Sequence, residues 1–545
     1  MPLRNRPTSG GPDPVAVDRR TVLRGLLGLG TLALVPGLAS CGQPGGDSAG
    51  TPAGATPTGG AGTGTAATGT APQPAVRSAV NGVLTTTLTA TNAQLKVLGQ
   101  TIDTMVYEGS LPAPTLRVSP GDTLRLKLTN NLTPNGTQGN MGMGSGMGGM
   151  GQLGGQGQAG GAAMSDNGTN LHTHGLHVSP TGNSDNVFLD IAPGASQDYE
   201  IKIPADHWGG LNWYHPHRHG SVSLQVLGGM AGALIVSGPL DEVPEVAAAT
   251  EQVLVLQRIQ NGPAMIAMMS SMHDNRFLSV SGNPAFTTNG QVNPQVQLRP
   301  GEVQRWRIVN ADPIDYFDLA LLDQRRAPLS GGLKFLARDG ITLPALETAD
   351  AHLMVPGNRF DLLVQAPTSP GTFTLTGRTA EGFGQPDIDF VTVQVAGPPK
   401  PMALPTRLPS QVQPITAEQV TARRTVTFGS WQGAMSVNGL TFDQGPDVLA
   451  LKVGTVEEWT VQNLTNQQHA FHIHTNPFYV VAENGQPVSA PAFWDTYPIP
   501  PATGPDAPGS ITVRMHPVDF TGRIVQHCHI LPHEDAGMMG VVDLV

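Results

Sequence analysis

One pattern occurs three times in this chain, about a domain's length apart. Residues 116–130, 296–310 and 449–463 each alternate apolar and polar side chains, turn at a glycine, alternate again and end at asparagine. A short turn precedes each copy, at Glu108-Gly109, Asn289-Gly290 and Asn438-Gly439. Alternation with period two predicts β-strands, and so long an interval fits whole domains rather than a solenoid. We therefore predict three similar β-sandwich domains in succession.

The composition agrees with short strands joined by turns. Charged residues make up 13% of the 545 residues, whereas glycine occurs 68 times and proline 48 times. We place the domains at residues 76–240, 245–398 and 425–545, with a Pro-rich linker near residues 398–409. The two cysteines exclude a disulfide framework, and the formal charge of −11 argues against nucleic acid as a partner.

The first 75 residues have the composition of an export signal and a tether. Residues 1–40 resemble a twin-arginine lipoprotein signal, with Arg19-Arg20 before an apolar run and Ser40-Cys41 after it. The run is too short to span a bilayer, although a cleaved signal with an incidental cysteine stays an alternative. Residues 41–75 predict a flexible tether. We expect an exported protein, either lipid-anchored through Cys41 at the extracytoplasmic face of a bacterial membrane or periplasmic or secreted, with no other membrane attachment.

Four pairs of histidines have the form His-x-His. They are His172/His174, His215/His217, His472/His474 and His527/His529. Random placement of the 16 histidines would give on the order of one such pair, and a single pair would fit a solvated surface strand. Because side chains alternate faces along a strand, both members of a pair point the same way. Four converging pairs supply eight imidazoles, enough for three copper ions, whereas zinc, the alternative metal, needs only three or four ligands.

The strand that contains Cys528 predicts a second metal site on its opposite face. If the two histidines that flank Cys528 point one way, its thiol points the other way. The same parity separates His469 from His472, and His533 and Met538 follow Cys528 at short intervals. Two imidazoles, a thiolate and a thioether are the ligands expected for a blue-copper electron-transfer site. A buried structural cysteine is the less specific alternative.

These motifs resemble those of a known family. His-Thr-His-Gly, His-Pro-His, His-x-x-His-x-His and His-Cys-His-x-x-x-His-x-x-x-x-Met look like the four copper signatures of three-domain multicopper oxidases, a group that includes laccases and bacterial cuprous oxidases. The resemblance covers nearly everything after the tether. It implies an all-β fold of three consecutive cupredoxin-like Greek-key β-sandwich domains.

The resemblance also implies four copper ions per chain, of type 1, type 2 and a binuclear type 3. By the motifs, the type 1 ligands are His469, Cys528, His533 and Met538. The type 2 ligands are His172 and His472, and the type 3 ligands are His174, His215, His217, His474, His527 and His529. The first two signatures lie in the first domain and the last two in the third, so the trinuclear cluster is expected where those domains meet.

The family's reaction is implied in the same way. Electrons from a donor would pass singly from the type 1 copper through Cys528 to its flanking histidines, and four of them would reduce dioxygen to water. Glu534, directly after His533, resembles the acid that supplies protons in related bacterial oxidases. Asp185 is the counterpart of a second acid near the type 2 copper, with a solvated loop aspartate as the alternative.

The electron donor is less constrained than the metal sites. A Gly-rich insertion, residues 135–167, contains Met141, Met143, Met147, Met150 and Met164, and a second cluster contains Met265, Met268, Met269 and Met272. Thioethers prefer Cu(I), and copper-tolerance oxidases often carry Met-rich segments, so we expect Cu(I), phenolic compounds or both as donor. Other metal ions stay open, as do a simple linker for the insertion and a buried stripe for the second cluster.

Two other functions remain alternatives. A copper nitrite reductase-like enzyme would lack the full set of eight histidines and the third domain. A non-catalytic periplasmic copper-binding or sequestering protein would account for the methionines and export, but not for a cysteine strand that serves two kinds of site. We favour the oxidase and expect a monomer.

Overall fold

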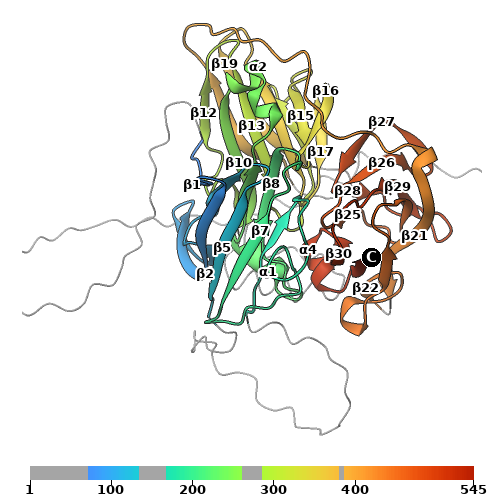
Figure 1. Ribbon diagram of the computed structural model, residues 1–545. Helices are drawn as coiled ribbons and strands as arrows, with labels where there is room; N and C mark the ends of the chain where they lie inside the picture. Colours follow the sequence, from blue (N-terminus) through green and yellow to red (C-terminus); the bar gives the residue numbers. More distant parts are fainter. Residues whose placement is uncertain (1–70, 134–166, 260–284, 380–385, 432) are drawn as a thin grey trace, which may run out of the picture. The chain divides into compact units, whose positions relative to one another are not determined.

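The computed structural model describes residues 71–133, 167–259, 285–379, 386–431 and 433–545, and strands dominate them (Figure 1). They form six sheets in three consecutive pairs. The sheets of the first pair have the orders β1-β4-β9-β8-β6 and β3-β2-β5-β7. Their strands are Val76–Ser78 (β1), Val83–Val97 (β2), Gln100–Tyr107 (β3), Thr115–Val118 (β4), Thr123–Asn131 (β5), His172–His174 (β6), Ser196–Lys202 (β7), Gly210–His215 (β8) and Gly232–Val236 (β9).

The second pair of sheets has the orders β11-β10-β13-β18-β15-β16 and β12-β20-β19-β14-β17. Its strands are Thr250–Ile259 (β10), Ala285–Thr288 (β11), Gln295–Leu298 (β12), Val303–Asn310 (β13), Phe317–Leu322 (β14), Leu333–Arg338 (β15), Ile341–Ala349 (β16), Ala351–Met354 (β17), Arg359–Gln365 (β18), Gly371–Thr379 (β19) and Ile388–Val395 (β20). Every residue of β13 is buried, including its arginines, which pair with Asp241, Glu251 and Asp361.

The third pair has the orders β22-β21-β24-β29-β26-β27 and β23-β31-β30-β25-β28. Its strands are Val420–Trp431 (β21), Ala434–Val437 (β22), Val448–Leu451 (β23), Val456–Asn463 (β24), His469–Ile473 (β25), Phe478–Glu483 (β26), Gln486–Trp494 (β27), Thr496–Ile499 (β28), Gly509–Met515 (β29), Gly522–Cys528 (β30) and Met539–Leu544 (β31). The all-β prediction of three successive sandwiches is confirmed. The predicted domain limits stay a prediction, and β21 begins at Val420, before the limit of 425.

Helices among the described residues are short. They are Val222–Gly228 (α1), Pro244–Ala247 (α2) and Leu531–Asp535 (α4), with 3₁₀ turns at Pro239–Glu242 (η1), Ala417–Gln419 (η2) and Phe442–Gln444 (η3). Helix α1 of the first domain contacts α4 of the third through Val222, Val226 and Leu531 (Figure 1). No helix among these residues is long and apolar enough to cross a membrane.

The threefold sequence pattern has one structural meaning. In each copy, the turn at Gly121, Gly301 or Gly454 carries the chain from one sheet of the sandwich to the other, joining β4 to β5, β12 to β13 and β23 to β24. The final asparagine of each copy is buried, and its side-chain amide donates to two backbone carbonyls of the following loops. Buried polar groups need such partners, which explains an asparagine at the end of each copy.

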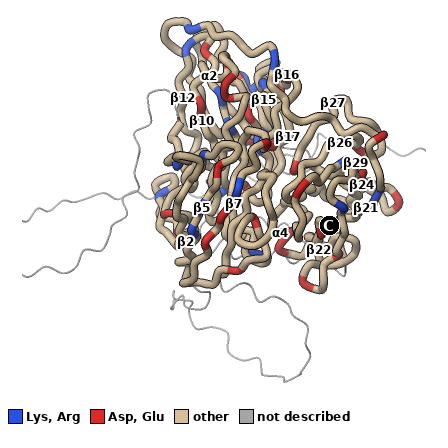
Figure 2. The backbone as a smooth tube through the Cα atoms, viewed as in Figure 1, with Lys and Arg blue, Asp and Glu red and all other residues tan. Residues whose placement is uncertain are grey.

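Charged side chains are spread thinly over this framework. Figure 2 shows Lys and Arg interspersed with Asp and Glu along the described strands. The apolar core divides into one large cluster shared by the second and third sandwiches and another in the first. The His-x-His pairs make up β6 or span the C-terminal ends of β8, β25 and β30.

Candidate metal centre

The structure brings the four His-x-His pairs together. Strand β6 pairs with β8 so that His172 is opposite His215, and β25 pairs with β30 so that His472 is opposite His527. The sheet that contains β6 and β8 contacts the sheet that contains β25 and β30 through these side chains, because the rings of His172 and His474 stack with their centroids 3.8 Å apart. All eight imidazoles are buried, with at most 2% of any of these residues exposed. The first and third domains therefore share one histidine cluster.

In three of the imidazoles, a hydrogen bond on the side away from the cluster determines which ring nitrogen faces the cluster. His172 Nδ1 lies 3.1 Å from both carboxylate oxygens of Asp185, and His215 Nδ1 lies 2.8 Å from the Pro216 carbonyl. His472 Nδ1 lies 2.7 Å from the Asp495 carbonyl. Because those nitrogens must donate to oxygen, the Nε2 atoms of the three histidines carry lone pairs, and these buried atoms have no hydrogen-bond partner.

The remaining imidazoles place nitrogen against nitrogen. His217 Nε2 lies 3.1 Å from His527 Nε2 and 3.1 Å from His474 Nε2. His527 Nδ1 faces the Cys528 carbonyl and the Glu534 carboxylate, so its Nε2 carries a lone pair. Converging lone pairs in a buried site repel one another unless a cation lies between them. Imidazole suits copper, and the donor set fits it.

Burial keeps these rings neutral. It lowers the pKa of His172, His174, His215, His217, His472, His474 and His529, with the neighbouring imidazoles adding to the effect for most of them. The pKa falls to about 3 for His215 and to about 4 for His217. A neutral imidazole is the form that binds a metal, so the cluster is ready for metal at neutral pH.

The two predicted acids lie against this cluster. Asp185 accepts hydrogen bonds from His172 and from the Thr173 amide, and burial raises the pKa of Asp185 to about 7 despite that amide. Glu534 Oε2 lies 3.1 Å from His527 Nδ1, and Oε1 lies 3.5 Å from His217 Nδ1. Burial raises the pKa of Glu534, but these two histidines outweigh it and lower the pKa to about 2. Near neutral pH, Asp185 is therefore partly protonated, whereas Glu534 is ionised.

The second predicted site forms on the other face of β30. Cys528 Sγ lies 3.5 Å from His469 Nδ1 and 3.7 Å from His533 Nδ1, and the two nitrogens are 3.2 Å apart. Met538 is fully buried, and its backbone joins both Cys528 and His533. Burial raises the pKa of Cys528 to about 12, so a thiolate here requires a positive partner such as a metal ion.

Other histidines have partners outside both sites. His177 bridges Thr475 and Asp519, His207 accepts from the His177 amide, and His219 contacts Asp443. His352 is half-buried among aromatic rings. Cys41, His273 and both methionine clusters lie outside the described residues.

Sequence reasoning missed Asp495 and Arg359. Asp495 Oδ1 lies 3.1 Å from His174 Nε2, and its backbone carbonyl meets His472. Arg359, from the middle domain, forms a bidentate pair with the Asp495 carboxylate. Neither residue belongs to a motif, and 136 positions separate them, so no local signal in the sequence could have joined them.

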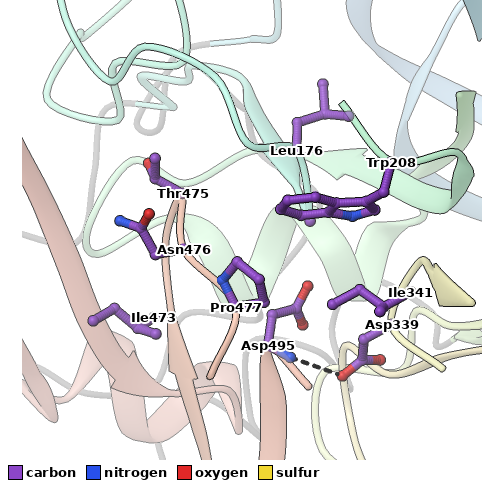
Figure 3. A pocket seen from close by; sticks show the side chains of 10 residues that line it. Leu176, Trp208, Asp339, Ile341, Ile473, Thr475, Asn476, Pro477 and Asp495 are labelled. Carbon is purple, nitrogen blue, oxygen red and sulfur yellow. Dashed lines mark hydrogen bonds between the residues drawn. The ribbon is translucent and has the colours of Figure 1, made fainter. Parts of the chain in front are cut away.

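A small cavity adjoins Asp495 (Figure 3). It is lined by residues of all three sandwiches, and three of these residues have a buried side-chain atom without a hydrogen-bond partner in the described chain, namely Trp208 Nε1, Thr475 Oγ1 and Asn476 Nδ2. Its volume of about 10 Å³ is that of a single water site. Thr475 has a φ of 66°, an unfavourable conformation for a β-branched residue that turns the chain directly after His474. The cavity suits one ordered water beside the cluster.

Comparisons with known proteins agree with the geometry. A multicopper oxidase family profile matches residues 407–544, and another matches residues 89–143 and 163–241. The multicopper oxidase mco of Staphylococcus haemolyticus is 22% identical over 449 residues, which are 81% of this chain and 83% of that protein. A laccase of Bacillus stratosphericus is 24% identical in an alignment over 493 residues that covers 81% of this chain and 90% of that protein.

Solved structures share the fold. The laccase-like multicopper oxidase CueO of Ochrobactrum sp. matches with a TM-score of 0.66 at 23% identity, covering 87% of this chain and 100% of its own. McoA of Aquifex aeolicus matches with a TM-score of 0.69 at 19% identity, covering 88% and 99%. The three sandwiches are therefore cupredoxin-like. The chain belongs to the multicopper oxidase family, whose members are copper-dependent oxidoreductases that oxidise small donors with dioxygen.

Proposed function

We propose that this protein is a four-copper oxidase with a type 1 site and a trinuclear site that reduces dioxygen to water. The observation that carries the proposal is the His-Cys-His segment at the end of β30. Cys528 points to His469 and His533, whereas the two residues beside it point into the eight-histidine cluster. A single strand thus serves both sites.

We assign the ligands by this geometry and the motifs. The type 1 ligands are His469, Cys528, His533 and Met538; the type 2 ligands are His172 and His472; the type 3 ligands are His174, His215, His217, His474, His527 and His529. The first and third domains, proposed at residues 76–240 and 425–545, supply all of them, and residues 245–398 supply none. When bound, copper supplies one-electron redox chemistry and the reduction of dioxygen.

The protein's own residues connect the sites and handle protons. Peptide bonds join Cys528 to His527 and His529, so a covalent path links the donor side to the cluster. Asp185 accepts from His172 Nδ1, and its raised pKa, about 7, lets it take up or release a proton beside that ring near neutral pH. Glu534 lies between Nδ1 of His217 and Nδ1 of His527, and we assign it the relay of protons to the cluster.

The donor is proposed as Cu(I), a phenolic compound or both. Support comes from the methionines of the insertion, since thioethers are soft ligands that prefer Cu(I). Export with a lipid anchor at Cys41, and a monomeric state, remain proposals from the sequence.

Oxygen uptake tests the function. The copper-loaded full chain is given Cu(I) as sole reductant and, separately, dimethoxyphenol, and the electrons consumed per dioxygen are counted. Cys528→Ser provides the blank, because Cu(I) also reacts with oxygen unaided. Four electrons per dioxygen without peroxide is the expected result. A copper-binding protein without catalysis would consume no oxygen above the blank, and a nitrite reductase-like enzyme would instead turn over nitrite.

A further inference from the structure

The middle domain, which supplies no proposed copper ligand, nevertheless reaches the histidine cluster through Arg359. This residue begins β18 and is fully buried. Its Nη1 and Nη2 donate to the two carboxylate oxygens of Asp495 at 2.7 and 2.6 Å. Paired forks of this kind are the strongest and most directional of ion pairs in proteins. The pair therefore fixes the plane of the Asp495 carboxylate.

Asp495 in turn contacts imidazoles from two domains. Its Oδ1 lies 3.1 Å from Nε2 of His174, and its backbone carbonyl lies 2.7 Å from Nδ1 of His472. These contacts leave His174 Nδ1 facing inward, 3.2 Å from His529 Nε2, and leave His472 Nε2 facing inward without a partner. The Thr496 hydroxyl lies 3.3 Å from Nε2 of His174 and 3.2 Å from Nδ1 of His472, the same nitrogens that contact Asp495. Asp495, together with this neighbour, thus selects opposite ring nitrogens of the two histidines for the metal.

Asp339 holds the same residues from the other side. Its carboxylate accepts from the amides of Arg359, Asp495 and Thr496, at 2.9, 3.2 and 3.1 Å. Figure 3 shows the bond from Asp495. The surrounding backbone is shaped to admit the guanidinium, because a Cβ at Gly175 would overlap Arg359 Nη2. That glycine is the last residue of the His-Thr-His-Gly motif, so its small size has a specific cause.

We infer that Arg359 is a positioning residue for the trinuclear site: acting through Asp495, it sets the tautomer and orientation of His174 and His472 from a domain that binds no copper. The inference rests on the proposed function. Residues that hold metal ligands in this way typically change metal affinity 10- to 100-fold when replaced.

Copper binding tests the inference without relying on turnover. Arg359→Gln and Arg359→Lys are titrated with copper in the full chain, with copper content, blue absorption, the near-ultraviolet type 3 band and the type 2 electron paramagnetic resonance signal as readouts. Arg359→Gln should bind copper at the trinuclear site about 10- to 100-fold more weakly, with blue absorption unchanged. Arg359→Lys should lie between, since it keeps the charge and lacks the fork.

Arg307→Gln is the matched control. Arg307 is also fully buried in the middle domain and pairs with Asp241 and Glu251, away from the imidazoles. It should keep the trinuclear signals of the unaltered chain. Should Arg359→Gln fail to fold, Arg359→Lys decides, with weaker trinuclear binding supporting the inference.

Three results would either overturn the inference about Arg359 or distinguish its failure from failure of the proposed function. Trinuclear affinity and a type 2 signal equal to those of the unaltered chain in the Arg359 variants would overturn the inference. Equal losses in Arg307→Gln would also overturn it, since the effect would then belong to domain stability. An unaltered chain without type 2 and type 3 signals would instead refute the proposed function.

Discussion

Glu534 provides the sharpest test of how the protein's own groups contribute to oxygen reduction. It lies on α4 between the two sites, with no exposed surface, and its oxygens lie 3.1 Å from His527 Nδ1 and 3.5 Å from His217 Nδ1. Glu534→Gln keeps the size of the side chain and one oxygen acceptor. It removes the negative charge and the ability to take up and release a proton.

The expected magnitude follows from that role. A positioned proton-transfer group contributes about 10²- to 10⁴-fold to a reaction rate, or about 3–5 kcal/mol of barrier. In stopped-flow experiments, donor should bleach the blue absorption of Glu534→Gln at the normal rate. Reoxidation by dioxygen should then be slower by about 10²-fold or more. Copper content should not change.

Asp535→Asn is the control for loss of charge on the same helix. Asp535 is half-buried and accepts from the amides of Gly220 and Ser223, so it holds α4 against the first domain without touching an imidazole of the cluster. Its reoxidation rate should stay close to normal. Glu534→Gln that reoxidises as fast as the unaltered protein would refute the proton-transfer role.

Three further predictions concern the second site, acid stability and backbone packing. Cys528→Ser should lose the blue absorption and one copper per chain yet keep the near-ultraviolet type 3 band, because the histidine cluster lies on the other face of β30; loss of both bands would contradict separate sites. Burial lowers the pKa of His352 to about 4 from 6.5, so its contribution to stability is present above pH 6.5 and is lost as pH falls towards 4. Between pH 7 and pH 5, the free energy of unfolding of copper-free His352→Phe, measured by denaturant titration, should therefore fall by about 2 kcal/mol less than that of the copper-free unaltered protein. The same pH dependence in both proteins would disprove the lowered pKa of His352. Gly175→Ala should lower the free energy of unfolding by roughly 1–3 kcal/mol in the same assay, because φ is 95° and the added Cβ overlaps Arg359. Gly182→Ala is the control, since its φ is 64° and its Cβ would lie in open space, and it should lower the free energy of unfolding less. Equal losses would argue against the overlap.

Much of the metal centre could be predicted because strand geometry is local. Period-two alternation alone predicts that Cys528 lies on the face opposite its two neighbours. The strand pairing agrees, because β25 places Phe471 opposite Cys528 and His472 opposite His527. The same reasoning identified the three domains from their repeated turns. The repeated sequence pattern also contains the asparagine at the end of each copy, such as Asn130, whose hydrogen bonds are visible only in the structure.

The support around the centre could not be predicted, because it depends on contacts between domains. Asp495 lies 23 positions after His472 at no strand or helix period, and Arg359 reads in the sequence as one more charged residue at the start of a strand. The burial of both faces of β13 also depends on distant residues, because its arginines are buried in ion pairs with Asp241, Glu251 and Asp361.

We propose that one chain holds a type 1 copper and a trinuclear copper cluster joined by the His-Cys-His segment. Metal analysis of the copper-loaded full chain, together with its absorption and electron paramagnetic resonance spectra, tests this proposal. Four copper ions per chain, blue absorption, a near-ultraviolet type 3 shoulder and a type 2 resonance are expected in the same sample. A fully loaded chain that lacks blue absorption, or that binds a single copper, would contradict it.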